Sequence, residues 1–402
     1  MSAPTAAADR TETPDPDTGA DPDTAEAPGR QPLFDNAKFA AVALVVCAHT
    51  WMPLAGADRT VAAAVLTVAA FAMPVFVTLC GRFAQPRPGR PAVDGRRLVT
   101  GVAVPYLVFQ VLYNLVGMAL EGRFAPFSLL EPRWLTWFLL SLFAWRLTVP
   151  LWTALRHPLA VAVLVAAASG AARALPEELA LSRTLAFLPW FVLGLVLRPH
   201  HVALLRRPAG RRWAPAVLAA VFAVLWLAAP ELLNPGWVEC TGSAAQLHVP
   251  YPVWLAVRAS LGLLSLVAGA AFLALLPEGR TRWTALGAAS LHVYLLHGLP
   301  LKLVQASGVY HARVLHHAWT ALPLFGTFAL TLAVVLALPP AVRLFTPLVG
   351  PRLADRLLKA PPEGEPRGAR GAAQSGSGRP DGHGRPEFTG RPAPGLRGSP
   401  RP

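Results

Sequence analysis

Long apolar runs separated by short polar loops dominate the chain between residues 33 and 350. Each run has roughly the 20 residues that a helix needs to cross a hydrocarbon core of about 30 Å. Strands that cross a membrane alternate apolar and polar positions, and these runs do not alternate. We therefore predict an all-α integral membrane protein, built as a bundle of about ten transmembrane helices.

The predicted spans follow one another with short connections throughout this region. They start near Asn36, Val61, Leu98, Trp134, Pro158, Thr184, Trp213, Pro252, Trp283 and Trp319. The fifth run is short and rich in alanine, so it is the least typical of a membrane helix. No internal repeat is evident, which weighs against transporters built from inverted repeats.

The two ends of the chain differ in composition from the region between them. Residues 1–32 are rich in Ala, Pro, Thr and Asp, and residues 351–402 are rich in Gly, Pro, Arg and Ser. Neither segment can bury enough apolar area to offset the entropy lost on folding. We predict a disordered acidic N-terminal segment at 1–32, a membrane domain at 33–350 and a disordered basic tail at 351–402.

Composition and charge agree with this organisation. Hydrophobic residues make up 54% of the 402 and charged residues only 14%, too few to cover a soluble protein of this length. The net charge of +14 comes largely from arginines in short loops and in the tail, not from one basic face, which argues against a nucleic-acid partner.

The loops also predict an orientation. Positive residues gather at 82–97, 198–212 and 352–359, whereas the intervening loops hold few, with Lys302 and Arg313 as modest exceptions. By the positive-inside rule, both termini of a multi-pass protein of the cell membrane are expected to be cytoplasmic. This alternation independently supports an even number of spans.

Cysteines and clustered histidines suggest no metal or redox chemistry. Cys47 and Cys80 fall within predicted spans and Cys240 is alone in a loop, so no disulfide framework is predicted. The cluster His311, His316 and His317 lacks a clear further ligand. We predict no metal site.

The first span, FDNAKFAAVALVVCAHTWMP, contains two ionisable residues, and such residues in membrane helices are functional candidates by default. Lys38 and His49 are eleven residues apart, which places them on one helix face about 16 Å from each other along the axis. Lys38 alone is more typical of a snorkelling flank residue. His49 is too deep to snorkel, and a neutral imidazole there can act as a general base.

Two further spans carry polar stripes. In the ninth, Ser290, Tyr294 and His297 share one face, which can be a site or simply contact between helices. In the third, a similar stripe can bind a polyhydroxylated acceptor or be satisfied internally; it consists of Tyr106, Gln110, Tyr113 and Asn114. Arg146 and Arg258 are intramembrane charges expected to pair with a buried anion or a carbonyl.

The stretch DNAKFAAVALVVCAH resembles the opening motif of the membrane acyltransferase-3 family, in particular its fucose 4-O-acetylase-like acetyltransferases. That family typically has an arginine, ten residues and then a histidine, and here Lys38 stands at the arginine position. Further stretches resemble later parts of the family in the expected order: MPVFVTLCGRF, RRLVTGVAVPYLVFQVLYN, WFLLSLFAWRL, PWFVLGLVL and SLHVYLLHG.

The resemblance implies transfer of an acyl group, acetyl being the family default, from cytoplasmic acyl-CoA to a hydroxyl of a carbohydrate or similar acceptor. Acyl-CoA is then a co-substrate, and no bound cofactor is expected. By this resemblance His49 is the base or a proton carrier. Our own hypothesis adds Tyr294 or His297 as the donor that steadies the oxyanion, and the polar stripe of the third span as the acceptor-binding face, with Gln110, Tyr113 and Asn114.

The family often carries a second motif, Arg, two residues and Arg, ahead of the third span. Arg97 fits its first place but Thr100 fills the second, so we expect Lys38, Arg82, Arg96 and Arg97 to hold the phosphates of the donor. The competing hypothesis is a polytopic transporter or flippase for a sugar-like or lipid-linked solute, which would also need deep histidines and polar stripes.

Overall fold

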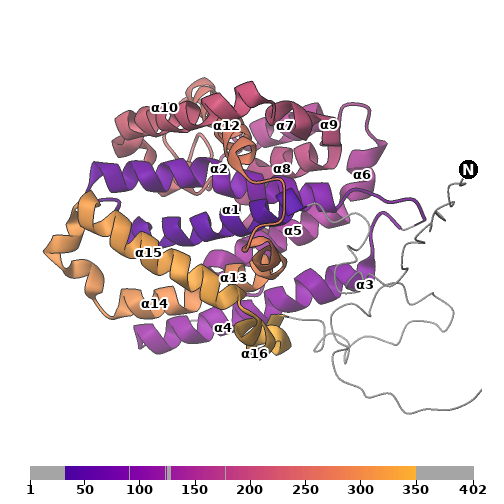
Figure 1. Ribbon diagram of the computed structural model, residues 1–402. Helices are drawn as coiled ribbons and strands as arrows, with labels where there is room; N and C mark the ends of the chain where they lie inside the picture. Colours follow the sequence, from indigo (N-terminus) through magenta and orange to yellow (C-terminus); the bar gives the residue numbers. More distant parts are fainter. Residues whose placement is uncertain (1–31, 90, 123, 125–127, 177, 350–402) are drawn as a thin grey trace, which may run out of the picture. The chain divides into compact units, whose positions relative to one another are not determined.

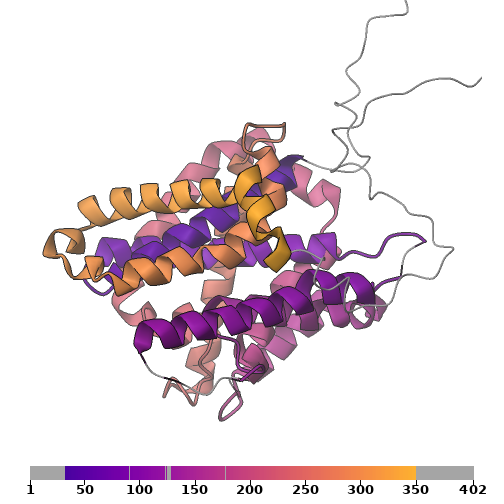
Figure 2. The same ribbon diagram turned by 90° about the horizontal axis from the view of Figure 1, so that it is seen from below.

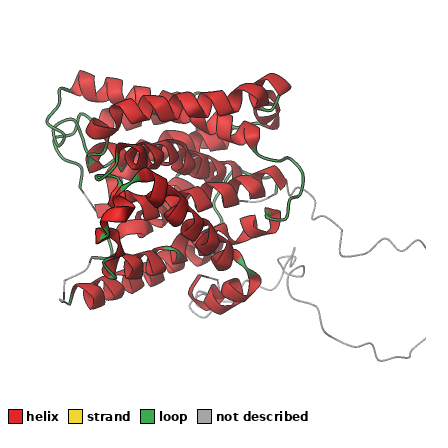
Figure 3. Cartoon of the chain, turned by 60° about the vertical axis from the view of Figure 1, so that its left-hand side comes forward, coloured by secondary structure: helices red, strands yellow, loops and turns green. Residues whose placement is uncertain are grey.

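The computed structural model describes residues 32–349, apart from residues 90, 123, 125–127 and 177. Every regular element in this part of the chain is a helix (Figure 3), as the hydrophobic pattern predicts. The predicted disordered segments fall almost entirely on residues 1–31 and 350–402, which lie outside the described residues.

Seven of the described helical stretches are long and apolar enough to cross a membrane. They correspond to α1 (Pro32–Trp51), α2 (Arg59–Phe83), α3 and α4 (Gly95–Leu98 and Val104–Glu121), α8 (Leu181–Val196), most of α10 (Pro208–Leu232), α12 (Tyr251–Leu275) and α15 (Ala318–Ala337). Three shorter apolar stretches are Trp134–Leu147, which contains α5 (Trp137–Leu147), α7 (Pro158–Ser169) and Thr284–Leu296, which contains α13 (Ser290–Leu296). Together they follow the order of the predicted spans.

Two of the shorter stretches continue into a second helix after a break. The remaining described α-helices are α6 (Val149–Ala154), α9 (Pro199–Leu205), α11 (Pro235–Val238), α14 (Gly298–Ala306) and α16 (Pro339–Val349). α5 gives way to α6 at Thr148, just before Pro150, and α13 gives way to α14 at His297, just before Pro300. Proline lacks a backbone N–H, so it is tolerated in the first turn of a new helix and disrupts a continuing one.

α1 lies inside the bundle. Figure 1 shows it between α2 on one side and α13 and α15 on the other, and Figure 2, seen from below, shows the orange segment that contains α13 and α15 on the near side of α1. Small residues on α1 allow this close packing, since Ala37 and Ala41 have no exposed surface. The first predicted span, which carries Lys38 and His49, is therefore enclosed by other helices.

The start of α1 is fixed by Asn36. Its side-chain amide donates to the carbonyls of Pro277 and Gly279 at 3.0 and 3.1 Å, and its oxygen accepts from the hydroxyls of Thr281 and Thr284 at 3.1 and 2.7 Å. These bonds satisfy a fully buried amide and tie α1 to the loop that follows α12.

Asp58 links the starts of two helices. One carboxylate oxygen accepts from the N–H groups of Thr60 and Val61 at the start of α2, and the other accepts from Ala318 at the start of α15. Burial acts to raise the pKa of Asp58, but these backbone donors outweigh it and hold that pKa below its usual range.

The outer surface of several helices is apolar. Large exposed side chains recur along α7, α10, α12 and α15, and they include Leu164, Leu227, Leu263 and Leu324. Water would disfavour such a surface, whereas a bilayer is its natural solvent. The packing therefore supports the membrane location that the sequence predicts.

Candidate active site

The two predicted catalytic histidines come together in the structure. His49 lies near the end of α1, and His297 lies at the break between α13 and α14. Their ring centroids are 5.5 Å apart, and the rings are tilted by 33°. His297 is fully buried and His49 partly so. Helix packing thus joins two residues that are distant along the chain.

The hydrogen bond of His297 defines its tautomer. Nδ1 lies 3.0 Å from the carbonyl oxygen of Val293, and because a carbonyl can only accept, Nδ1 carries the proton in the neutral ring. Nε2 is buried and has no hydrogen-bond partner within the described part of the chain. Neutral His297 therefore presents an unprotonated acceptor nitrogen, which can take a proton but cannot donate one to an oxyanion.

Two tyrosines near the histidines are already engaged. The hydroxyl of Tyr294 donates to the carbonyl of Leu135 at 2.8 Å, and that of Tyr113 donates to the carbonyl of Leu295 at 2.7 Å. The Tyr294 ring also lies 6.0 Å from that of His297. In this arrangement both phenols hold backbone segments next to the histidines.

Trp134 completes the group and was not anticipated from the sequence. Its ring centroid is 5.6 Å from that of His49 and 6.4 Å from that of His297. Its φ is 51°, in the left-handed region that residues with a side chain rarely adopt. A tryptophan at the start of a span is typical of a membrane interface, so the sequence position of Trp134 did not indicate a site residue.

Gln110 on α4 holds the segment that carries Trp134. Its amide donates to the carbonyls of Ser128 and Glu131, and its oxygen accepts from the N–H of Arg133 and the hydroxyl of Thr136. These four bonds use the full capacity of the side chain. The stripe on α4 is thus satisfied internally in this structure, with Asn114 bonded to the carbonyl of Gln110 at 2.8 Å.

Two of the predicted donor-binding cations, Lys38 on α1 and Arg82 on α2, lie at the other end of α1. Lys38 forms an ion pair with Asp35 at 2.6 Å and lies 4.8 Å from the ring centroid of Phe83. Arg82 lies 5.7 Å from the ring centroid of Phe34. The two aromatic rings pack edge to face, so both cations flank one aromatic pair.

A third cation, Arg146 on α5, adjoins this end. Both it and Lys38 lie near enough to Cys80 to interact with it electrostatically, and the Nε of Arg146 is buried without a hydrogen-bond partner among the described residues. The predicted Arg96 and Arg97 lie on the short α3 instead, and Arg97 pairs with Asp94 at 3.1 Å.

The face of α1 between Lys38 and His49 is packed. Val42 and Val46 lie on it, and neither has any exposed surface. A ligand that reaches from the cations to the histidines must therefore part α1 from its neighbours.

A cleft of about 280 Å³ opens beside Trp134. It lies between α4 and α14 and is lined by Tyr113, Gly117, Leu120, Glu121, Arg133, Trp134, Lys302, Gln305 and Ala306. Because Trp134 adjoins both histidines, the cleft leads towards them from the end of the bundle at which α1 ends.

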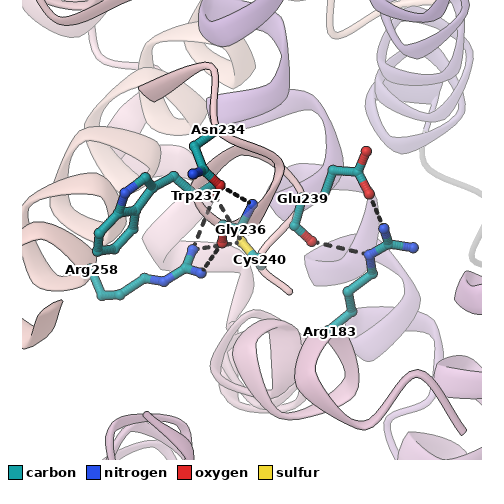
Figure 4. A network of polar contacts seen from close by, with 7 residues as sticks. All are labelled: Arg183, Asn234, Gly236, Trp237, Glu239, Cys240 and Arg258. Carbon is teal, nitrogen blue, oxygen red and sulfur yellow. Dashed lines mark hydrogen bonds and ion pairs between the residues drawn. The ribbon is translucent and has the colours of Figure 1, made fainter. Parts of the chain in front are cut away.

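Arg258 was predicted to pair with a buried anion or a carbonyl, and in the structure its guanidinium donates hydrogen bonds to backbone carbonyls. Figure 4 shows its guanidinium reaching the carbonyls of Gly236 and Trp237, at 2.7 and 3.2 Å. Arg183 binds the same loop through Glu239. These arginines fasten the loop between α10 and α12.

The clustered histidines have separate contacts. His316 Nε2 lies 3.1 Å from the carbonyl of Tyr310, and His317 stacks on Trp319. Within the described residues, no group of three or more His, Cys, Asp or Glu side chains is placed to hold a metal ion.

The sequence was compared with known protein families. The model Acyl_transf_3, described as an acyltransferase domain, matches residues 32–339, most of the chain. The chain belongs to the acyltransferase-3 family. As a family member with a bundle of apolar helices, it is a membrane acyltransferase. Comparison with curated proteins and with solved structures gave no significant match.

Proposed function

We propose that this acyltransferase moves an acetyl group from cytoplasmic acetyl-CoA to a hydroxyl of a carbohydrate or related acceptor. The observation that carries the proposal is the close approach of two imidazoles, the partly buried His49 and the fully buried His297, inside an acyltransferase-3 domain. The resemblance of the opening motif to fucose 4-O-acetylase-like acetyltransferases supports a sugar hydroxyl as the acceptor.

The donor is proposed to bind at the Lys38 end of α1. Lys38 and Arg82 flank one aromatic pair there, Arg146 lies near the same Cys80 as Lys38, and the buried Nε of Arg146 has no protein partner within the described part of the chain. Guanidinium groups bind phosphate through charge-assisted hydrogen bonds, which suits the nucleotide part of CoA. The pantetheine arm would then follow α1 towards His49, displacing the packing around Val42 and Val46.

The chemistry requires one base. His49 removes the proton from the acceptor hydroxyl as its oxygen attacks the thioester carbonyl; the new C–O ester bond forms and the C–S bond breaks. The thiolate of CoA then takes the proton back from His49. We propose that the bare Nε2 of His297 accepts a hydrogen bond from the nearby His49 ring during the reaction and so holds that ring in the tautomer that can act as base.

A transfer assay tests the proposal. The purified protein is placed in lipid nanodiscs with radiolabelled acetyl-CoA and a deacylated extract of glycans and lipids from cells that lack the protein. We expect His49→Ala to lower transfer at least 100-fold, the scale of a lost general base.

The matched control is His200→Ala, which removes an exposed histidine on α9 and should leave transfer unchanged. Full activity in His49→Ala would exclude the proposed base. Movement of a solute across vesicles without any consumption of acetyl-CoA would support the transporter hypothesis instead.

A further inference from the structure

Lys302 is a cation whose position the membrane topology does not explain. It lies on α14, at the end of the bundle where the loops otherwise carry few positive residues. Its ammonium is 4.9 Å from the ring centroid of Trp134, and its side chain is half-buried. It forms no ion pair with any carboxylate of the described residues.

The charges around Lys302 leave the cleft positive. Arg133 also lines it, and the one carboxylate among the described lining residues, Glu121, binds Arg133 at 2.9 Å and also lies near enough to Lys302 to attract its charge, so two cations face one anion. A snorkelling lysine would direct its ammonium outward to lipid headgroups. Here the ammonium lies over an indole that lines the cleft, so the charge faces a space that a ligand can enter.

One face of α14 lines the cleft. Gly298, Lys302 and Ala306 are spaced by four residues, so they share one face of α14. A Cβ at Gly298 would lie 2.3 Å from the hydroxyl of Tyr113 and 2.6 Å from the Trp134 ring, so only glycine permits this approach. Trp134 thereby contacts both Lys302 and His49.

We propose that the acceptor carries an anionic group, a carboxylate or a phosphate, and that Lys302 binds this group while a nearby hydroxyl reaches His49. The proposal rests on the proposed function, because it concerns the acceptor of the same site. An ammonium makes a charge-assisted hydrogen bond to such an anion, about twice as strong as a neutral one. Lys302 thus selects the acceptor by charge, and His49 acts on its hydroxyl.

The test identifies the charge of the acylated product. Glycan and lipid fractions of a deacylated extract, from cells that lack the protein, are incubated separately with the nanodisc protein and radiolabelled acetyl-CoA. We expect the labelled product to bind an anion-exchange resin. Its fraction of origin distinguishes a lipid-linked source from a free glycan. Phosphatase treatment and carbodiimide amidation distinguish phosphate from carboxylate.

Variants of Lys302 then test whether this residue recognises the negative charge of the acceptor. We expect Lys302→Met to lower transfer to the anionic product about tenfold or more, the scale of one lost charge-assisted bond. Lys302→Arg keeps the charge and should retain most of the transfer, which separates charge from folding. Arg313→Met removes an exposed cation at the same end of the bundle, away from the cleft, and should have no effect.

Two results would overturn the proposal while leaving the proposed function intact: a neutral labelled product, or equal transfer by Lys302→Met and the wild type. If no fraction gains label in a His49-dependent manner, the proposed function itself fails, and this inference fails with it.

Discussion

At Trp134 the backbone adopts a conformation that costs about 1–3 kcal/mol for a residue with a side chain. The surrounding structure maintains it through Gln110, whose four hydrogen bonds bracket Trp134 from Ser128 to Thr136. Strained residues of this kind are common at functional sites, where neighbouring contacts over-determine the geometry. We infer that Gln110 positions Trp134 beside His49.

Gln110→Leu tests this role with a side chain of similar size. We expect a loss of about 2–4 kcal/mol in stability, because the change leaves buried donors and acceptors without partners. Thermal unfolding of the purified protein measures it, and the transfer assay should show reduced activity. Glu231→Leu, at an exposed position near the end of α10 with no side-chain hydrogen bond among the described residues, is the control and should change neither. Unchanged unfolding and transfer in Gln110→Leu would mean that other contacts hold Trp134.

Among the helices, α2 and α8 approach each other most tightly where two glycines face. A Cβ on Gly194 would lie 2.0 Å from the carbonyl oxygen of Thr78, and one on Gly81 would lie 2.0 Å from that of Phe191. In lipid no hydrophobic effect holds helices together, so close van der Waals packing through small residues carries much of the association. The crossing also fixes the backbone at Arg82, because a Cβ on Gly194 would lie 2.7 Å from the backbone nitrogen of Arg82.

Gly194→Ala should separate these helices. We expect it to destabilise the protein by about 1–3 kcal/mol, since the obstructing atoms are backbone and cannot rotate away. Gly262→Ala on α12 is the matched control, because a Cβ there meets nothing within 4 Å. Thermal unfolding of both variants in the same detergent compares them. Equal unfolding temperatures for the two variants would contradict the importance of the crossing.

For the whole molecule, the arrangement along α1 implies a direction across the membrane. The three cations lie at one end of this helix, and the histidines with the cleft lie at the other. If positive loops are cytoplasmic, the donor end faces the cytoplasm and the cleft faces the opposite side. The protein would then pass an acyl group from one side of the bilayer towards the other.

Cysteine labelling measures this orientation. In a variant without Cys47, Cys80 and Cys240, Gly56→Cys and Gly95→Cys each introduce an exposed thiol, at opposite ends of α2 and its neighbours. We expect a membrane-impermeant maleimide to label Gly56→Cys in intact cells, and Gly95→Cys only after the membrane is opened. The reverse pattern would invert the predicted topology.

The sequence alone determined the class of fold and the principal candidate residues. Apolar run length fixes membrane helices because a bilayer has one thickness and no water to satisfy an exposed backbone. Helix periodicity placed Lys38 and His49 on one face, and α1 runs unbroken through both positions. The resemblance to the acyltransferase-3 family, which the matched domain confirms at the level of the family, supplied acyl transfer as the reaction class.

Only the tertiary structure decided which distant residues meet. The contact of His49 with His297 and Trp134, the internal bonding of Gln110, and the position of Lys302 over an indole all join separate helices. Periodicity shows which residues share a face of one helix. It does not show which other helix that face contacts, because the contact depends on how the side chains of many spans pack together. For the same reason the sequence did not place Arg146 near the Lys38 end of α1, nor Arg258 against carbonyls of the loop between α10 and α12.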